Sequence, residues 1–295
     1  MSDLDPALDH LIAVLTRLEV PLIADLQPGL SLRRIDELTK DLPHDFPQEL
    51  RRLYAWRNGS EPATGRNQLY PGGGFVPLVY ALVNYKGLVE AYEGGFKGTE
   101  IEMTDVYDLR WFPVFLNYGN SAAVVVCGDA PDAGSVWSLL LEDTSQREHL
   151  AESVGEFIEV VARRWESGAF FFEPGVGPCE DYAALAAERR AIQQPSTDVD
   201  RLVRSLVDGN PGEQAAALRE LKQYLYPDAI PLLVRLLEHR DSQTRRNAAG
   251  LLGQMGDPSV VPALMSVLDD RAYSVRESAK WSISVLQRHQ KRSQE

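Results

Sequence analysis

The sequence predicts an α+β domain, in which helices flank an antiparallel sheet, followed by an all-α domain of helical repeats. Two observations support this prediction. The first part of the chain runs from helix patterns into consecutive strand patterns without long crossovers, and the last part contains a 31-residue repeat. A length of 295 residues suits two domains. We place them at residues 1–192 and 198–295, on either side of the polar, proline-broken stretch around Pro195.

Three helices are predicted at the start of the first domain. Leucines at spacings of four and three begin just before Asp5-Pro6 and predict an amphipathic helix; they are Leu4, Leu8, Leu11, Leu15 and Leu18. Ser31 is a suitable cap for a second helix. A third helix is expected from Phe46 to Arg57, and Asn58-Gly59 ends it with residues that tolerate positive φ.

Strand patterns follow the helices. They cover residues 74–77, 112–118, 122–127 and 135–141. The turn-rich residues 128–134 join the last two runs, so these two are predicted to pair as an antiparallel hairpin. A helix is then expected from Ser153 to Trp165, and the large apolar side chains are expected to form the core, among them Leu53, Tyr54, Trp111, Phe112 and Phe157.

The repeat relates Pro227-Asp-Ala-Ile-Pro-Leu-Leu233 to Pro258-Ser-Val-Val-Pro-Ala-Leu264, 31 residues later. The same offset relates Leu206, Leu237 and Leu268, then Ala217, Ala248 and Ala279, and it pairs Arg245 with Arg276. Each unit is predicted to form two short helices, and the three units cover about 198–226, 227–257 and 258–289. One helix pair cannot bury its apolar face alone, so the units are expected to stack.

The stretch from Gln243 to Pro258 resembles HEAT repeats, in particular the short type first named from phycobilin lyases. The resemblance covers about a third of the chain. It implies a stack of helix pairs and says little about function, because the same repeat serves scaffolds, regulators and a few enzymes.

Four stretches of the first domain resemble the SUKH superfamily, which includes fungal glucan-synthesis regulators and bacterial immunity proteins. They are the "LP..f...y...NG"-like element from Leu42 to Gly59, the glycine-containing stretch from Leu69 to Leu78, Trp111-Phe-Pro-Val114, and the closing helix that starts at Ser153. Val154 stands where that family often has Phe. The resemblance implies a protein-binding domain and an immunity role, in which the domain covers the active surface of a toxin.

The charge is concentrated in the first domain. The formal net charge of the chain is −13, and residues 1–195 hold 30 Asp and Glu against 16 Lys and Arg, whereas residues 196–295 hold 13 against 14. Such an acidic surface repels nucleic acid and anionic lipid, so neither is expected as a partner. It suits a basic protein partner, although solubility alone also explains an acidic composition.

An acidic cluster before Trp111 supplies the candidate partner-binding residues. Its members are Glu100, Glu102, Asp105 and Asp108, and Glu90 and Glu93, on a helix expected after Lys86, extend it. A solvated loop explains these carboxylates better than paired catalytic groups, so we interpret them as part of a docking surface.

Motifs for catalysis and for metal or cofactor binding are not found in the sequence. There is no phosphate-binding Gly-Lys-Ser/Thr loop, no Gly-x-Ser-x-Gly elbow, no His-x-x-x-His and no Cys-x-x-Cys. We therefore expect a protein that is not an enzyme and has no metal site and no cofactor. Two cysteines give no disulfide framework, no signal peptide is visible, and the longest apolar runs have about six residues, so a cytoplasmic protein outside the membrane is expected.

The sequence leaves three functions to consider. The first is an immunity protein that neutralises a toxin, such as a basic nuclease, through its acidic surface. The alternative is a regulatory scaffold related to the control of cell-wall synthesis, which would have several partners. An enzyme of the bilin-lyase kind is disfavoured because both cysteines, Cys127 and Cys179, precede the repeats.

Overall fold

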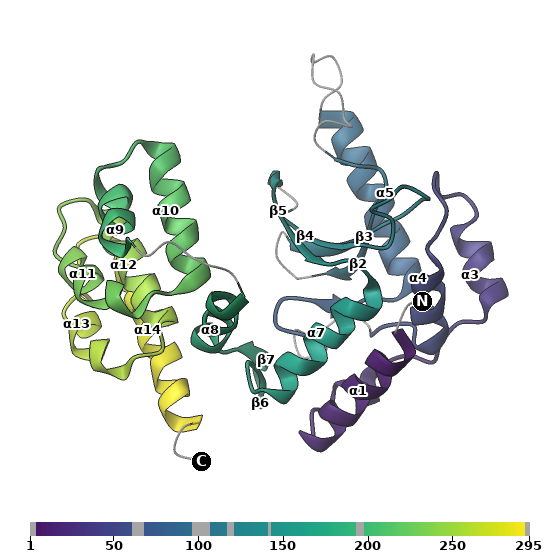
Figure 1. The fold of residues 1–295 in the computed structure, drawn as a ribbon, viewed down its shortest axis with the longest axis horizontal. Coiled ribbons are helices and arrows are strands. Elements are labelled where there is room, and N and C mark those ends of the chain that lie inside the picture. The colour runs from purple at the N-terminus through teal and green to yellow at the C-terminus, as the bar shows by residue number, and fades with distance from the viewer. Residues whose placement is uncertain are drawn as a thin grey trace. The chain divides into compact units, whose positions relative to one another are not determined.

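The computed structural model describes residues 4–60, 68–95, 107–116, 121–140, 143–192 and 198–292. The chain divides into two compact units, Met1–Cys179 and Glu180–Glu295 (Figure 1). The first unit is α+β and the second is all-α, as the sequence predicts. The sequence places the boundary at residues 193–197, whereas the contacts place helix α8 (Tyr182–Ile192) in the second unit, because Tyr182 and Ala186 pack into the core of that unit.

The first unit is built on a five-stranded antiparallel sheet whose strands follow one another in chain order. They are β1 (Gly74–Phe75), β2 (Trp111–Leu116), β3 (Ser121–Val126), β4 (Val136–Leu140) and β5 (Asp143–Ala151). The predicted hairpin is confirmed, with Val125 opposite Val136. Strand β5 was not predicted, because its sequence DTSQREHLA lacks an apolar alternation and it pairs with β4 alone as an edge strand.

Helices pack on the sheet and on one another in the first unit. They are α1 (Leu4–Arg17), α2 (Leu22–Asp25), α3 (Leu32–Thr39), α4 (Gln48–Trp56), α5 (Leu78–Gly95) and α7 (Val154–Glu166). The predicted cap is confirmed, because the Ser31 hydroxyl accepts a hydrogen bond from the amide of Arg34. The Ser153 hydroxyl caps α7 in the same way, by accepting a hydrogen bond from the amide of Glu156. Residues 170–173 and 177–180 form a second, two-stranded sheet, β6 and β7.

Both faces of the five-stranded sheet are covered. Strand residues such as Val124 and Leu139 form a buried cluster that packs against Leu88 and Val89 of α5. From another part of the sheet, the Phe115 ring lies 5.2 Å from the ring of Phe157 on α7. The side chains predicted for the core, Leu53, Tyr54, Trp111, Phe112 and Phe157, are all buried.

Helices α1 and α7 are joined by a histidine between two carboxylates. His10 Nδ1 lies 3.0 Å from Glu159 Oε2, and His10 Nε2 lies 3.4 Å from Glu166 Oε2. The hydrogen bond with Glu159 is the main reason that the pKa of His10 is raised above its ordinary value of 6.5, against the opposing effect of burial. Protonated His10 therefore stabilises the contact between the first and last helices of this unit.

The His10→Gln variant tests this contact. Because the folded pKa of His10 is raised, its contribution to the free energy of unfolding is fully present below pH 6.5 and is lost as the pH rises through the folded value. We expect His10→Gln to be less stable than the wild type at pH 5.5 and equally stable at about pH 9, in urea unfolding. The cost should shrink when Glu159 and Glu166 are both replaced by Gln. If the loss in free energy of unfolding caused by His10→Gln did not change with pH, protonated His10 would not be the stabilising group.

Three helix pairs make up the described part of the second unit, as predicted, and α8 precedes them. They are α9 (Val199–Asp208) with α10 (Pro211–Tyr224), α11 (Ile230–Leu236) with α12 (Ser242–Gln254), and α13 (Val261–Met265) with α14 (Tyr273–Arg292). Single 3₁₀ turns, Pro227–Ala229 and Pro258–Val260, begin the second and third pairs. Asp198 and Asp241 cap α9 and α12, and Gly256, with φ +73°, follows the end of α12.

Small residues bring α12 and α14 close together. The Ser282 hydroxyl donates to the Ala249 carbonyl at 2.8 Å, and the Ser278 hydroxyl donates to the Arg246 carbonyl at 3.1 Å. A Cβ atom added to Gly253 would lie 2.4 Å from Ser282 Cβ and 2.6 Å from its Cα. The spacing of these two helices therefore depends on the missing side chain of Gly253.

Replacing Gly by Ala should have opposite effects at two helical positions. Gly253→Ala forces α12 and α14 apart, and we expect it to lower the free energy of unfolding by about 1–3 kcal/mol. Gly87→Ala in α5 meets nothing within 4 Å, so the better helix propensity of Ala should raise stability by about 0.5–1 kcal/mol. Thermal and urea unfolding measure the change in the free energy of unfolding for each variant, which should be negative for Gly253→Ala and positive for Gly87→Ala. A stabilised Gly253→Ala protein would mean that the two helices pack less closely than described.

Candidate partner-binding surfaces

Two of the six predicted docking carboxylates have described side chains, Glu90 and Asp108. Glu90 lies on α5 with its side chain 64% exposed, and its Oε1 is 3.7 Å from Lys86 Nζ. Glu93 belongs to the same helix, but its side chain is outside the described residues. Glu100, Glu102 and Asp105 also lie outside them. The docking role of all six residues stays a prediction.

Asp108 is held in a network of charged groups around Arg110. Arg110 Nη2 donates to Asp108 Oδ2 at 2.6 Å, and Arg110 Nη1 donates to Asp132 Oδ1 at 2.7 Å. Burial alone would raise the pKa of Asp108, but the hydrogen bonds from Arg110 outweigh it, and the pKa is lowered. The same bonds to Asp108 and Asp132 raise the pKa of Arg110. Two carboxylates thus share one guanidinium, so the network carries a single net negative charge in a fixed geometry.

Helix α5 also carries an exposed apolar patch that the sequence did not reveal. Val79, Tyr80 and Val83 are 52%, 41% and 64% exposed, whereas Leu78, Ala81 and Tyr85 on the other side are buried. At 100° per residue, the three exposed side chains share one face with Lys86, Gly87 and Glu90. We call these six residues the α5 outer face.

The reason that the patch escaped prediction is the composition of α5. The helix begins LVYALVNY and is apolar around most of its circumference, which is typical of a helix buried on all sides. The sequence places a helix after Lys86, whereas the structure begins it at Leu78. An apolar patch beside charged groups is the composition of a protein-binding surface.

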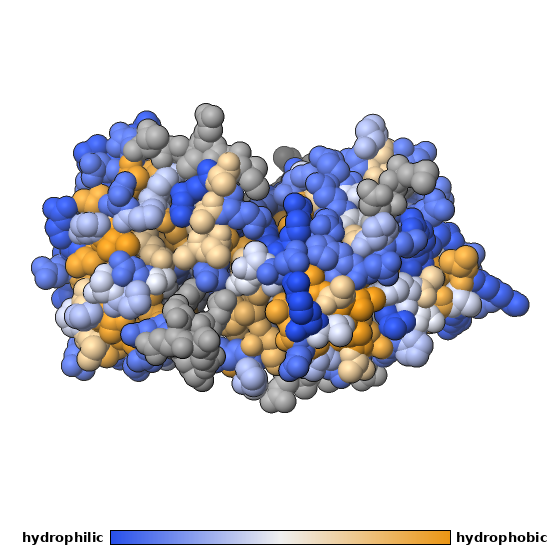
Figure 2. All heavy atoms as spheres, turned by 60° about the horizontal axis from the view of Figure 1, so that its bottom comes forward, coloured by the Kyte–Doolittle hydropathy of each residue, from blue (hydrophilic) through white to orange (hydrophobic). Residues whose placement is uncertain are grey.

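The view in Figure 2 shows that hydrophilic residues cover most of the visible surface and that apolar residues emerge between them in both units.

Metal sites and membrane spans set requirements on the side chains and helix lengths of the described residues. In the part of the chain that the structure describes, no group of three or more His, Cys, Asp and Glu side chains is placed to hold a metal ion. Of the described helices, none is long and apolar enough to cross a bilayer. Cys127 is buried, which raises the pKa of its thiol to about 12, so this cysteine is not an activated nucleophile.

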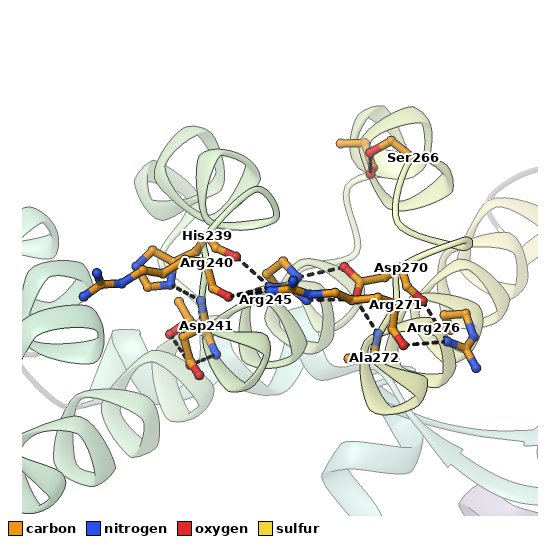
Figure 3. Close-up of polar contacts among 11 residues, drawn as sticks. His239, Arg240, Asp241, Arg245, Ser266, Asp270, Arg271, Ala272 and Arg276 are labelled. Atoms are coloured by element: carbon orange, nitrogen blue, oxygen red, sulfur yellow. Dashed lines mark hydrogen bonds and ion pairs between the residues drawn. The ribbon is translucent and has the colours of Figure 1, made fainter.

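A buried arginine joins the second and third helix pairs of the second unit (Figure 3). Arg245 is 5% exposed, and it donates from Nε and Nη2 to the two carboxylate oxygens of Asp270 at 2.7 and 2.8 Å. Arg245 Nη1 donates to the carbonyls of His239 and Arg240. Hydrogen bonding to Arg245 lowers the pKa of Asp270, and the same pairing raises the pKa of Arg245.

The arrangement recurs at the 31-residue offset and explains the pairing of Arg245 with Arg276. Arg276 Nη1 donates to the carbonyls of Asp270 and Arg271, which are the equivalents of His239 and Arg240. Gln214 stands at the same position of the first pair, and its side-chain amide donates to the Val207 carbonyl at 3.4 Å. The arginine therefore ties the loop within each of the last two helix pairs to the helix that follows it.

Comparison with known proteins identifies both parts of the chain. Residues 29–160 match the SMI1/KNR4 family (SUKH-1), and residues 199–284 match HEAT repeats. The chain combines a SUKH-1 domain with HEAT repeats. Phycocyanobilin lyase subunit alpha of Microchaete diplosiphon is 41% identical over 59 residues, which cover 18% of this chain and 20% of that protein, and this similarity fits the HEAT-like part. Both resemblances inferred from the sequence are thus confirmed.

The two matched ranges contain different features of the structure. The α5 outer face and the Arg110 network lie within the SUKH-1 match. Helix α1, which carries His10, precedes the match, and Glu166 lies beyond it. Arg245, Asp270 and Arg276 all lie within the HEAT match. The arginine network therefore belongs to the framework of the HEAT unit, and the α5 outer face is an exposed feature of the SUKH-1 match.

The Asp270→Asn variant tests the arginine network. The amide keeps an acceptor for the Ala272 backbone but removes the charge that faces buried Arg245, so we expect a loss of about 3 kcal/mol in the free energy of unfolding at pH 7. The folded pKa of Asp270 is lowered from 3.8, so the advantage of the wild type should be present above about pH 5 and should decline as the pH falls through the folded value. Urea unfolding across this range measures both.

Asp257→Asn is the matched control for Asp270→Asn. Asp257 also accepts a backbone amide, that of Ser259, and no described ion pair involves it. We expect this variant to lose far less stability than Asp270→Asn. Equal losses in the two variants would show that capping, rather than the ion pair with Arg245, accounts for the effect.

Proposed function

We propose that this chain is a non-catalytic, cytoplasmic protein-binding module whose SUKH-1 domain neutralises a toxin, such as a basic nuclease, by covering its active surface. A SUKH-1 domain with HEAT repeats indicates a protein-interaction module. The observation that supports a basic partner is the charge of the first unit. Residues 1–179 hold 27 Asp and Glu against 14 Lys and Arg, whereas residues 180–295 hold 16 of each.

The charge and the α5 outer face would have different tasks in binding. A field of one sign speeds the encounter with a partner of opposite sign and disfavours acidic proteins. The apolar side chains Val79, Tyr80 and Val83 would then exclude water at the centre of the contact, because buried apolar anchors contribute most of the affinity of protein interfaces. Glu90 lies on the same helical face and would pair with a cation of the partner.

The other predicted carboxylates extend this proposal. Glu93, Glu100, Glu102 and Asp105 follow Glu90 in the sequence and would enlarge the acidic surface. Asp108 would contribute through its ordered network with Arg110 and Asp132, which has one negative charge in excess. Because its position is already fixed, binding through this network would cost little conformational entropy.

A regulatory scaffold related to cell-wall synthesis control is the second candidate. It is favoured by the presence of a HEAT unit beside the SUKH-1 domain, since the second unit gives the chain an additional surface for another partner. A scaffold would bind several proteins and would give no protection against a toxin. Growth of cells that co-express this chain with candidate basic nuclease toxins separates the two functions.

Affinity capture with the full chain as bait tests the proposal directly. Mass spectrometry identifies the retained proteins, and the proposal expects a basic protein among them whose toxicity the chain suppresses on co-expression. Retention of acidic proteins alone, or of no protein, would overturn it. A retained basic protein that is not toxic, together with several other partners, would favour the scaffold.

The double variant Val83→Asp, Glu90→Lys tests the α5 outer face. Both side chains are exposed, so the fold should tolerate the changes. We expect the affinity for the retained basic protein to fall at least about tenfold, because the variant places a carboxylate in the apolar patch and a cation opposite the cations of the partner. Biolayer interferometry measures the dissociation constant.

A matched control has the same change in charge elsewhere in the first unit. Leu18→Asp, Asp9→Lys also replaces an exposed apolar residue by Asp and an exposed carboxylate by Lys, at and just after α1. This variant should keep its affinity within about twofold. If both double variants weaken binding equally, net charge and not the α5 outer face governs the interaction.

A further inference from the structure

The second helices of the three HEAT pairs line a groove of about 390 Å³. Lys222 comes from α10, Arg246, Asn247 and Gln254 come from α12, and Tyr273 and Trp281 come from α14. Gly250 and Ser278, which are small, lie between these longer side chains. We call this feature the HEAT groove. Its lining is contributed entirely by the second unit.

The cations of the HEAT groove have no carboxylate partner in the described part of the chain. Lys222 and Arg246 are exposed, and Arg246 makes only a 3.5 Å contact with the amide oxygen of Gln243. The neighbouring Arg245, in contrast, forms a buried ion pair with Asp270. Glu277 also lines the groove, but its carboxylate lies 2.8 Å from Lys280 Nζ. The groove thus has two positive charges that its own carboxylate does not compensate.

Aromatic and amide side chains complete the lining. Tyr273 is 68% exposed and Trp281 is 39% exposed, which is unusual for rings of this size. Exposed Trp, Tyr and Arg side chains in one hollow have the composition of a protein-binding hot spot. The carboxamides of Asn247 and Gln254 each combine a donor and an acceptor, as a peptide group does.

We propose that the HEAT groove binds an acidic peptide segment of a protein partner, with an apolar or aromatic side chain of that segment placed against Trp281 and Tyr273 and its carboxylates facing Lys222 and Arg246. A small molecule is disfavoured, because such ligands are usually enclosed by their site and Tyr273 is largely open to solvent. Nucleic acid is disfavoured because Glu277 lies in the wall and the unit has no net charge. The inference does not depend on the function proposed for the SUKH-1 domain, whose expected partner has the opposite charge.

Peptide selection on the full chain tests the inference. A phage-displayed library of random 12-residue peptides is selected on the wild type and, in parallel, on the Lys222→Glu, Arg246→Glu variant. We expect the wild type to enrich peptides that combine Asp or Glu with an aromatic or aliphatic residue, and we expect the variant to bind these peptides at least tenfold more weakly in fluorescence anisotropy. The control is Arg204→Glu, Arg219→Glu, which makes the same charge change at exposed arginines that do not line the groove.

The outcomes separate the inference from its alternatives. Loss of peptide binding in the groove variant but not in the control supports it, and further loss in Trp281→Ala locates the apolar anchor. Enrichment of basic peptides, no enrichment, or equal loss in both charge variants overturns it. Tighter binding of a labelled 20-nucleotide single strand than of any selected peptide also overturns it. None of these results bears on toxin protection by the SUKH-1 domain, which the growth assay measures separately.

Discussion

The buried ion pair between Arg245 and Asp270 constrains how the second and third helix pairs of the HEAT unit stack. A guanidinium removed from water is costly unless its donors are satisfied, and here the donors meet the two oxygens of Asp270 and the carbonyls of His239 and Arg240. One side chain thereby fixes the loop of its own helix pair against the loop of the next. In the same stack of helix pairs, Gly253 of α12 lies against Ser282 of α14 and sets the spacing of these two helices. Residues of both helices also line the HEAT groove.

The first unit is organised by a different constraint, the burial of an aromatic core on both sides of an antiparallel sheet. Phe115 packs on Phe157 of α7, while α5 covers another part of the sheet with Leu88 and Val89. Helix α5 has apolar residues around most of its circumference, and only one side of it is buried. Val79, Tyr80 and Val83 are therefore left on the surface, next to Glu90. One side of α5 thus packs into the core, and the opposite side forms the candidate binding surface.

The two units offer surfaces of opposite preference. The first unit has nearly twice as many carboxylates as cations, so long-range attraction favours a basic protein. The second unit is neutral as a whole, and its preference comes from the local placement of Lys222 and Arg246, whose charges are not compensated in the groove. Partners of opposite charge are therefore expected at the two units, a basic protein at the first and an acidic segment at the second.

Much of the fold was accessible from the sequence because local signals were strong. The 31-residue repeat, the leucine spacing of α1, the cap Ser31, and the turn between β3 and β4 each act within a few residues or through a fixed period. Strand β5 was missed because an edge strand with a polar sequence has no apolar alternation. Helix α8 was assigned to the wrong side of the linker by composition alone, whereas its contacts with the HEAT core assign it to the second unit.

The sequence by itself determined the two families, the helical repeat and the uneven charge, because these are properties of residue identity and spacing. Only the tertiary structure decided which side chains are free to bind. It showed that Asp108 is paired with Arg110, that Arg245 is buried while Arg246 is exposed, and that one side of the first turns of α5 is exposed. The physical reason is that exposure and pairing depend on what packs against a residue from distant parts of the chain, and neighbouring arginines in one helix face different surroundings.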